Sequence, residues 1–113
     1  MVTRGLDRCL FVYPRSEWND LAAKLAALPL SQKDSRAFAR LMLAGAWDAE
    51  IDNQGRVAIP EYLRTYARLG KHAIFTGLYN RMEIWDEDRW LEYKTKTEEE
   101  SDSIAQALGD LGV

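Results

Sequence analysis

The chain has 113 residues, of which 47% are hydrophobic and 11% aromatic, with a net charge of −3. This length and apolar content suit one domain, or two small halves sharing a core, and exclude a disordered chain. No run approaches the eighteen or more consecutive apolar residues of a membrane-spanning helix, so no membrane partner is expected. The single cysteine and single histidine exclude an internal disulfide and a cysteine-cluster metal site, and they leave a zinc site or a His-based triad without partners.

The charge is unevenly distributed along the chain. Residues 1–47 carry a net charge of +3, residues 48–90 of −2 and residues 91–113 of −4. Attraction to phosphate depends on local fields more than on the total, so the mildly basic front part permits a nucleic-acid partner without arguing for one. Residues 1–7 show no apolar signal-peptide stretch, and one cysteine agrees with a reducing compartment, so we expect a cytoplasmic protein.

The chain resembles itself at a fixed offset of 72 in the numbering. Residues 4–13 align without a gap over residues 76–85, and Trp18 then falls on Trp90. The shared pattern is Gly-Leu, three variable residues, Leu or Met, one variable residue, Val or Ile, and an aromatic. Self-similarity of this kind indicates a structural repeat, and each copy is predicted to be a short hairpin followed by a helix.

The first copy is predicted to place an inward-facing pair, Leu10 and Val12, on its second strand. The outward positions of this strand hold Cys9 and Phe11, which are apolar and are therefore expected to be buried against another part of the protein. Another part of the same subunit could pack over them, or they could form a subunit interface, and the sequence leaves both alternatives open. Cys9 is interpreted as a half-buried hydrophobic residue rather than a redox sensor.

Two helices are predicted between the copies. Ser16 is the expected cap of the first helix, and Ser31 is the expected cap of the second, with Asp34 at the capping-box position. The spacing of the first helix predicts a buried apolar stripe, made of Trp18, Leu21, Leu25 and Leu28.

A strand-turn-strand is predicted ahead of the second copy. Residues 46–52 alternate like a strand, and residues 56–59 resume one after a turn. The turn is formed by Asn53, Gln54 and Gly55, of which the glycine can take positive φ.

A helix over residues 61–68 is predicted to follow. Pro60 suits its first turn, and Gly70 is placed to cap its end. At the offset of 72, the counterpart of this whole stretch falls before Met1, so the first copy is expected to lack about two dozen opening residues.

The second copy is predicted to close with a strand and a helix. Met82 and Ile84 alternate with Arg81 and Glu83, which predicts an inward pair and an outward pair. A helix is expected to run on after Trp90. Residues 98–102 are interpreted as a solvated, loosely ordered acidic segment.

The run Asp-Asn-Gln-Gly-Arg-Val-Ala-Ile-Pro at residues 52–60 resembles the strand-turn-strand of the SpoVT/AbrB superfamily. Its D-x-x-G-R core is similar to that of the MraZ family, as are residues 48–52, 83–86 and 3–14. D-x-x-G-R alone is a weak signal, but the repeat, the linking helices and the order of elements strengthen it, and the resemblance covers nearly the whole chain.

The resemblance implies an α+β fold, a double-split β-barrel built from two repeats with flanking helices. Residues 1–17 would then be the remnant of the first SpoVT-AbrB repeat and residues 18–45 a helical linker. Residues 46–90 would form the complete second repeat, and residues 91–113 a C-terminal helix and acidic tail.

The same resemblance implies a nucleoid-associated transcription regulator, usually a repressor. Such a protein binds short direct repeats in the promoter DNA of its division-and-cell-wall gene cluster, as a ring-like homo-oligomer. No cofactor, metal or small-molecule substrate is expected, and nothing in the sequence supports an enzyme. The alternative is an oligomerising β-scaffold or interaction module that has lost DNA binding, because D-x-x-x-R occurs once here and twice in the family.

Arg56 is the residue expected to reach DNA, since its guanidinium can bridge a phosphate or take a guanine edge bidentately. Asp52 would repel phosphate, so it is expected to orient Arg56 or to bond the turn amides. Gly55 shapes the turn, and Asn53 and Gln54 at its tip are expected to meet base edges or phosphates. The structural alternative is an exposed turn whose Asp–Arg pair contributes little.

Overall fold

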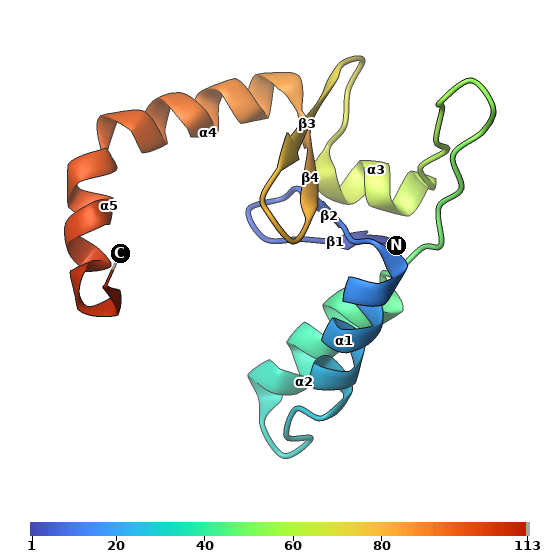
Figure 1. Cartoon of the computed structure of the whole chain (residues 1–113), viewed down its shortest axis with the longest axis horizontal. Helices are drawn as coiled ribbons and strands as arrows, with labels where there is room; N and C mark the ends of the chain where they lie inside the picture. Colours follow the sequence, from blue (N-terminus) through green and yellow to red (C-terminus); the bar gives the residue numbers. More distant parts are fainter. Residues whose placement is uncertain (113) are drawn as a thin grey trace.

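A four-stranded antiparallel sheet forms the centre of the protein (Figure 1), in a computed structural model that describes residues 1–112. Its strands are β1 (Val2–Arg4), β2 (Leu10–Val12), β3 (Ala73–Gly77) and β4 (Met82–Asp86). They lie in the order β1-β2-β4-β3, so two hairpins meet through β2 and β4. Helices link and flank these hairpins, which confirms the predicted α+β class.

The two hairpins are related by a local two-fold axis. The pairing of β2 with β4 joins three residue pairs: Leu10 with Ile84, Phe11 with Glu83 and Val12 with Met82. Phe11 and Glu83 are separated by the repeat offset of 72, so each lies opposite its own counterpart in the repeat. An antiparallel contact of this kind is what a two-fold axis between two like units produces. The pairing therefore supports the internal repeat.

The prediction of a gap-free repeat is wrong in one turn. Five residues separate β1 from β2, whereas four separate β3 from β4. The counterpart of Thr3 is consequently Thr76, at an offset of 73, while β2 and β4 keep the offset of 72. Asp7 and Arg8 in the longer turn both have a φ of 60°. A surface turn can gain a residue in this way without disturbing the strands that it joins.

A helix follows each hairpin. Helix α1 (Arg15–Ala26) and helix α4 (Glu87–Glu99) begin at corresponding positions of the repeat. The predicted stripe is confirmed for Trp18 and Leu25, which are buried, and for Leu21, which is partly buried. Leu28 packs against the same cluster but lies beyond the end of α1. Helix α4 starts three residues before Trp90, which was expected to open it. Its N-cap is Asp86, whose carboxylate accepts a hydrogen bond from an amide of the first turn.

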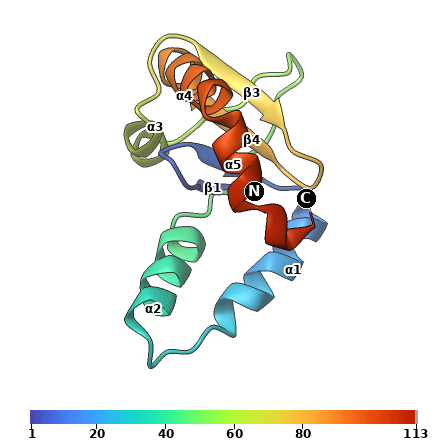
Figure 2. The ribbon, with the colours of Figure 1, turned by 90° about the vertical axis from the view of Figure 1, so that its left-hand side faces the viewer.

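Helix α2 (Lys33–Ala39) and the π-helical turn η1 (Arg40–Ala44) return the chain to the sheet. With α1 they form a helical pair at one side of the sheet (Figures 1 and 2). Met42 of η1 is buried, and its carbonyl oxygen accepts a hydrogen bond of 2.6 Å from the hydroxyl of Thr3. This buried contact ties the helical pair to β1.

The predicted caps of α1 and α2 are wrong. The residues that precede these helices are Pro14 and Gln32, and neither makes a side-chain capping hydrogen bond. Ser16 therefore lies inside the first turn of α1, and Ser31 lies outside α2. A proline has its φ already fixed near the value that a helix start needs, so α1 can begin without a hydroxyl cap.

Apolar side chains are buried on both faces of the sheet. The cluster that includes α1 consists of Cys9, Phe11, Trp18, Leu25, Met42 and Trp85. The cluster on the opposite face consists of Val2, Leu10, Leu63, Ala67 and Ile84. Cys9 and Phe11 are thus covered by another part of the same chain, which decides between the two alternatives that the sequence left open.

The burial of β4 corrects the predicted inward and outward pairs. Ile84 is buried as expected, but Met82 is exposed and Glu83 is buried. The Glu83 carboxylate accepts a hydrogen bond of 3.1 Å from the Trp85 indole and pairs with Arg81 at 3.3 Å. The prediction assumed that one face of the strand meets water, whereas α1 and its neighbours cover the face that carries Glu83.

Helix α3 (Glu61–Ala67) packs on the cluster opposite α1, with Leu63 and Ala67 buried. Pro60 is its N-cap rather than a residue of its first turn. The helix ends at Ala67, and its C-cap, Arg68, takes the left-handed conformation with a φ of 52°. The expected cap at Gly70 is therefore wrong, since the left-handed residue is a non-glycine two positions earlier.

The C-terminal part of the described chain is helical. Helix α5 (Ser101–Ala107) and the short helix η2 (Gly109–Leu111) follow α4 after a bend at Glu100 (Figure 1). The expectation of a loosely ordered acidic segment over residues 98–102 is wrong, although its side chains are exposed as predicted. Within residues 1–112, no helix combines the length and the apolar character that crossing a membrane requires.

Candidate nucleic-acid interface

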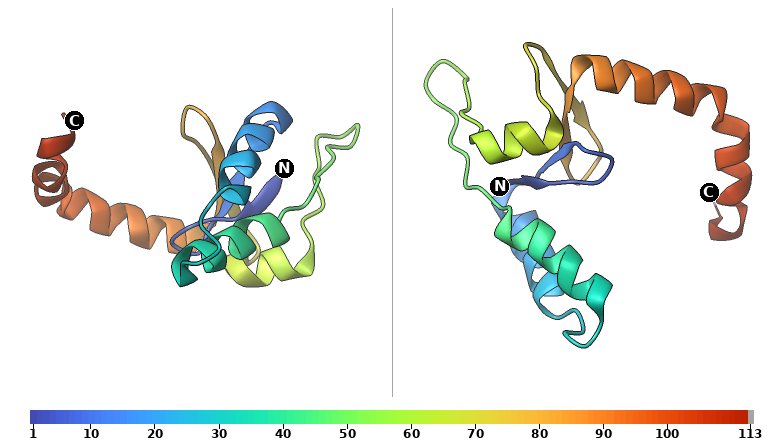
Figure 3. Two further views of the ribbon diagram at one scale, coloured as in Figure 1. Left: turned by 90° about the horizontal axis from the view of Figure 1, so that it is seen from below. Right: turned by 180° about the vertical axis from the view of Figure 1, so that it is seen from behind.

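A long loop carries all the residues that the sequence singled out for DNA binding. It joins η1 to α3 and stands away from the sheet in three views (Figures 1 and 3). Two isolated bridges, Val2 with Trp47 and Ile51 with Val57, are the only β pairing recorded for it within the described chain. The predicted strands over residues 46–52 and 56–59 therefore shrink to single bridges, because the projecting loop has no neighbouring strand to extend a ladder.

The tip of the loop is a tight turn, as predicted. The amide of Gly55 donates to the carbonyl of Asp52 at 3.0 Å, and the amide of Asp52 donates to the carbonyl of Arg56 at 2.9 Å. Gly55 has a φ of 77°, which L side chains rarely adopt. Asn53 and Gln54 lie at the exposed tip.

The Asp52 carboxylate organises this turn. One oxygen, Oδ1, accepts from the amides of Gln54 at 2.9 Å and Arg56 at 2.8 Å. The other, Oδ2, accepts from Nε of the Arg56 guanidinium at 3.0 Å. Asp52 thus makes both contacts that the sequence offered as alternatives. These hydrogen bonds, led by the one from the Arg56 amide, hold the pKa of the Asp52 carboxyl below its ordinary value of 3.8.

The Arg56 side chain is oriented but open. Its side chain is 73% exposed, and among the described residues its only recorded partner is Asp52, through Nε. The terminal nitrogens of the guanidinium lie beyond that contact, so the edge of the fork that suits phosphate or guanine is available. The Asp52 carboxylate binds the Nε edge of the Arg56 guanidinium and so orients its plane.

Three contacts that the sequence did not reveal anchor the base of the loop. Trp47 exchanges two backbone hydrogen bonds with Val2, of 2.9 and 2.7 Å. The Arg15 guanidinium binds both carboxylate oxygens of Asp48 at 2.7 Å. The Tyr62 hydroxyl donates to the carbonyl of Gly45 at 2.9 Å. These partners are far apart in the chain, so no local pattern could have found them.

The loop therefore offers one ordered, positively charged group at the end of a projecting arm. Two carboxylates of the loop are engaged, Asp52 by the turn and by Arg56, and Asp48 by Arg15. Across residues 1–112, no group of three or more potential metal-ligating side chains occurs. The arrangement can contact an anion by hydrogen bonds and charge.

Together, the repeat, the two-fold sheet and the loop define a two-unit α+β protein that presents an arginine on an exposed turn. The family model described as "MraZ protein, putative antitoxin-like" matches residues 1–41 and 42–110. The chain belongs to the MraZ family.

Curated relatives agree with this assignment. "Transcriptional regulator MraZ" of Thermoanaerobacter sp. (strain X514) is 49% identical over 113 residues, which are all of this chain and 79% of that protein. The protein of the same name from Ligilactobacillus salivarius (strain UCC118) is 50% identical over 110 residues, or 97% of this chain and 77% of that protein. Each of these relatives thus extends beyond the aligned part.

Proposed function

We propose that this protein regulates transcription by binding promoter DNA through the turn at residues 52–56, with Arg56 as the principal contact. The observation that carries the proposal is the Asp52–Arg56 pair at the end of the projecting loop, which orients a guanidinium before DNA arrives. A group that is already ordered loses less conformational entropy on binding. Relatives aligned along the whole chain are named transcriptional regulators, which supports the same function.

The tip supplies the other contacts. The side chains of Asn53 and Gln54 are exposed beside Arg56, and amide groups can hydrogen-bond base edges or phosphate oxygens. Gly55 allows the backbone to turn sharply, so the tip is narrow enough to approach a groove. In this role Asp52 positions Arg56 and does not touch DNA.

One arginine gives weak binding, so the proposal includes an oligomer. Affinity for DNA at physiological salt is built from several phosphate contacts, and a ring of like subunits supplies them by avidity when its spacing matches short direct repeats. Apolar residues on α4, on α5 and η2, and between these last two helices are exposed and could pack against a second subunit: Leu91, Ile104, Leu108 and Leu111.

The finer features of the family complete the proposal. They are a double-split barrel, a nucleoid location in the cytoplasm, and repression of the division-and-cell-wall gene cluster. The repeat of two hairpin units around a local two-fold axis supports the barrel. We infer the same boundaries as before: a remnant first repeat over residues 1–17, a helical linker over 18–45, a full repeat over 46–90 and a helical end over 91–113.

A mobility-shift titration with promoter DNA that carries direct repeats tests the function. We expect Arg56→Ala to weaken binding by about 1–3 kcal/mol, or roughly five- to 150-fold. Lys24→Ala is the matched control, because it removes one exposed positive charge on α1, outside the loop. Equal affinities of Arg56→Ala and wild type would show that this loop does not bind the DNA. If neither protein bound, the oligomerising scaffold would be favoured.

A further inference from the structure

The two ends of the projecting loop are joined by a side-chain hydrogen bond. Gly45 is the C-cap of η1, just before the loop, and Tyr62 lies in the first turn of α3, just after it. The Tyr62 hydroxyl donates to the carbonyl of Gly45 at 2.9 Å, although the two residues are 17 positions apart in the chain. Gly45 and Tyr62 thus form the neck of the loop, where the loop leaves the body of the protein and returns to it.

Arg4 of β1 packs against both residues of the neck. Its guanidinium carbon lies 5.9 Å from the centre of the Tyr62 ring, within the range of a cation–π contact. Its Nε lies 2.9 Å from the position that a Cβ at Gly45 would occupy. The same Cβ would lie 2.7 Å from the carbonyl oxygen of Leu41, so the close approach requires a glycine at this position. The neck is therefore built where β1, the end of η1 and the start of α3 meet.

The chain around Gly45 is held against β1 before and after the neck. The hydroxyl of Thr3 donates to the carbonyl of Met42, three residues before Gly45, at 2.6 Å. Trp47, two residues after Gly45, exchanges backbone hydrogen bonds with the edge of β1. Because these contacts fix Gly45 in place, the Tyr62 hydroxyl ties the returning end of the loop to a fixed point.

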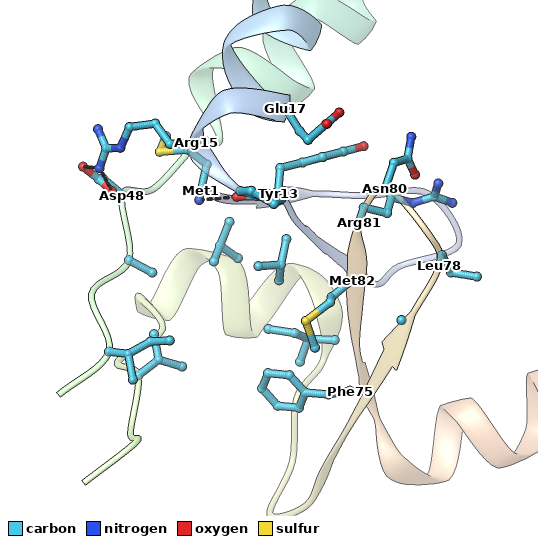
Figure 4. A pocket seen from close by; sticks show the side chains of 18 of the residues that line it. Met1, Tyr13, Arg15, Glu17, Asp48, Phe75, Leu78, Asn80, Arg81 and Met82 are labelled. Atoms are coloured by element: carbon cyan, nitrogen blue, oxygen red, sulfur yellow. Dashed lines mark hydrogen bonds and ion pairs between the residues drawn. The ribbon is translucent and has the colours of Figure 1, made fainter. Parts of the chain in front are cut away.

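A second side-chain contact at the base of the loop is expected to hold it less firmly. Arg15 and Asp48, which Figure 4 shows as a pair, have side chains that are 69% and 54% exposed. Ion pairs as exposed as this contribute little to stability and are screened by salt. The pair also joins the loop to α1 and does not connect its two ends. Tyr62 is therefore the side chain whose hydroxyl decides whether the neck stays closed.

Tyr66 makes the same kind of contact about one turn further along α3. Its hydroxyl donates to the carbonyl of Gly5 at 2.6 Å, and the guanidinium carbon of Arg8 lies 4.9 Å from the centre of its ring. This contact joins α3 to the first hairpin and includes no residue of the loop. Tyr62 and Tyr66 thus each combine a hydroxyl-to-carbonyl hydrogen bond with an arginine on the ring, and only the contact of Tyr62 reaches an end of the loop.

We propose that Tyr62 is a positioning residue for DNA binding, which closes the neck so that the loop holds the turn at residues 52–56 in one direction from the sheet. This inference rests on the proposed function. The loops of an oligomer bind direct repeats together only when their spacing matches that of the DNA, so each loop has to point in a defined direction. With an open neck, the turn keeps its own hydrogen bonds but its position varies. The apparent affinity then falls with the population of closed necks.

The test compares Tyr62→Phe with Tyr66→Phe, because each removes one hydroxyl and keeps the ring that packs against an arginine. Both variants should lower the midpoint of thermal unfolding by about 2–6 °C, since each loses one hydrogen bond. Only Tyr62→Phe should speed hydrogen exchange at the amide of Trp47, which lies beside the neck. In fluorescence anisotropy with promoter DNA, Tyr62→Phe should bind about two- to tenfold more weakly than Tyr66→Phe.

Salt dependence separates positioning from direct contact. Tyr62→Phe should keep the wild-type slope of log affinity against log salt concentration, because a closed neck presents the same phosphate contacts, whereas each lost contact changes the slope by about 0.9. A changed slope, an affinity equal to that of Tyr66→Phe, or unchanged exchange at Trp47 would each overturn the positioning role. If wild type and Arg56→Ala bind promoter DNA equally, the proposed function itself fails, a result that is obtained without any variant of Tyr62.

Discussion

Phe11 and Glu83 lie opposite each other on β2 and β4, and each is also the counterpart of the other in the internal repeat. The two-fold axis that passes between them organises the molecule. It relates the two hairpins, which pair edge to edge through β2 and β4. Helices α1 and α4 leave the sheet at corresponding points, and one loop of the D-x-x-G-R type lies on one side. That loop carries Arg56, the proposed DNA contact.

Substitutions at Asp52 separate its two contacts. Asp52→Asn keeps an oxygen for the turn amides but loses the ion pair with Arg56, so promoter affinity should fall about two- to fivefold. Asp52→Ala loses both contacts and should bind more weakly still. Fluorescence anisotropy measures both affinities. If Asp52→Ala binds more tightly than wild type, repulsion of phosphate outweighs orientation of Arg56, and the positioning role is wrong.

The lowered pKa of Asp52 predicts how the order of the turn at residues 52–56 depends on pH. Because hydrogen bonds from the Arg56 and Gln54 amides hold this pKa below 3.8, the carboxylate is charged throughout the physiological range. Its contribution to the ordered turn is complete above 3.8 and is lost as the pH falls through the lowered pKa. Nuclear magnetic resonance of the Arg56 amide should therefore show one transition, below pH 3.8. A transition above that pH would contradict the hydrogen bonds.

Gly55→Ala should weaken DNA binding through the backbone. A residue with a side chain at a φ of 77° costs about 1–2 kcal/mol, so the turn opens and affinity falls roughly five- to thirtyfold. The global melting point should change little, because the loop stands away from the core. Gly109→Ala is the control, since it also meets open space but has no positive φ. Equal binding by both variants would show that the turn geometry is irrelevant.

Cys9 should be inert in the folded protein. Burial, with the negative charges of Glu83 and Asp7, raises the pKa of its thiol to about 12, so little thiolate exists at pH 8. Iodoacetamide should alkylate Cys9 only after unfolding. The stability that the protonated thiol contributes is complete below pH 9 and is lost between about 9 and 12, a loss that Cys9→Ala should remove. Rapid alkylation of the native protein at pH 8 would contradict this burial.

Two exposed apolar side chains, Ile104 on α5 and Leu108 directly after it, should matter for the proposed assembly. Ile104→Lys and Leu108→Lys together place two charges where a neighbouring subunit would pack, so the mass measured by light scattering should fall towards that of one chain. Gln106→Lys, on the same helix, is the control. An unchanged mass in the double variant would show that the subunits meet elsewhere.

Local patterns predicted the turn, the stripe of α1 and the repeat, since each depends on residues close in the chain or on simple periodicity. Asp52 and Gly55, for example, specify the turn by themselves. The cover over Cys9 and the burial of Glu83 depend on α1 and on Trp85, whose packing no local pattern reveals. The expected strands of the loop failed for the same reason, because a strand needs a neighbour as well as an alternating sequence.

The salt dependence of promoter binding tests whether Arg56 contacts the DNA backbone. If Arg56 contacts phosphate, the slope of log affinity against log salt concentration should become shallower in Arg56→Ala by about 0.9 for each loop that engages the DNA. Helix α1, which carries Lys24, lies away from the loop (Figure 1), so Lys24→Ala should leave the slope unchanged. A slope and an affinity in Arg56→Ala equal to those of wild type would show that Arg56 does not contact the DNA.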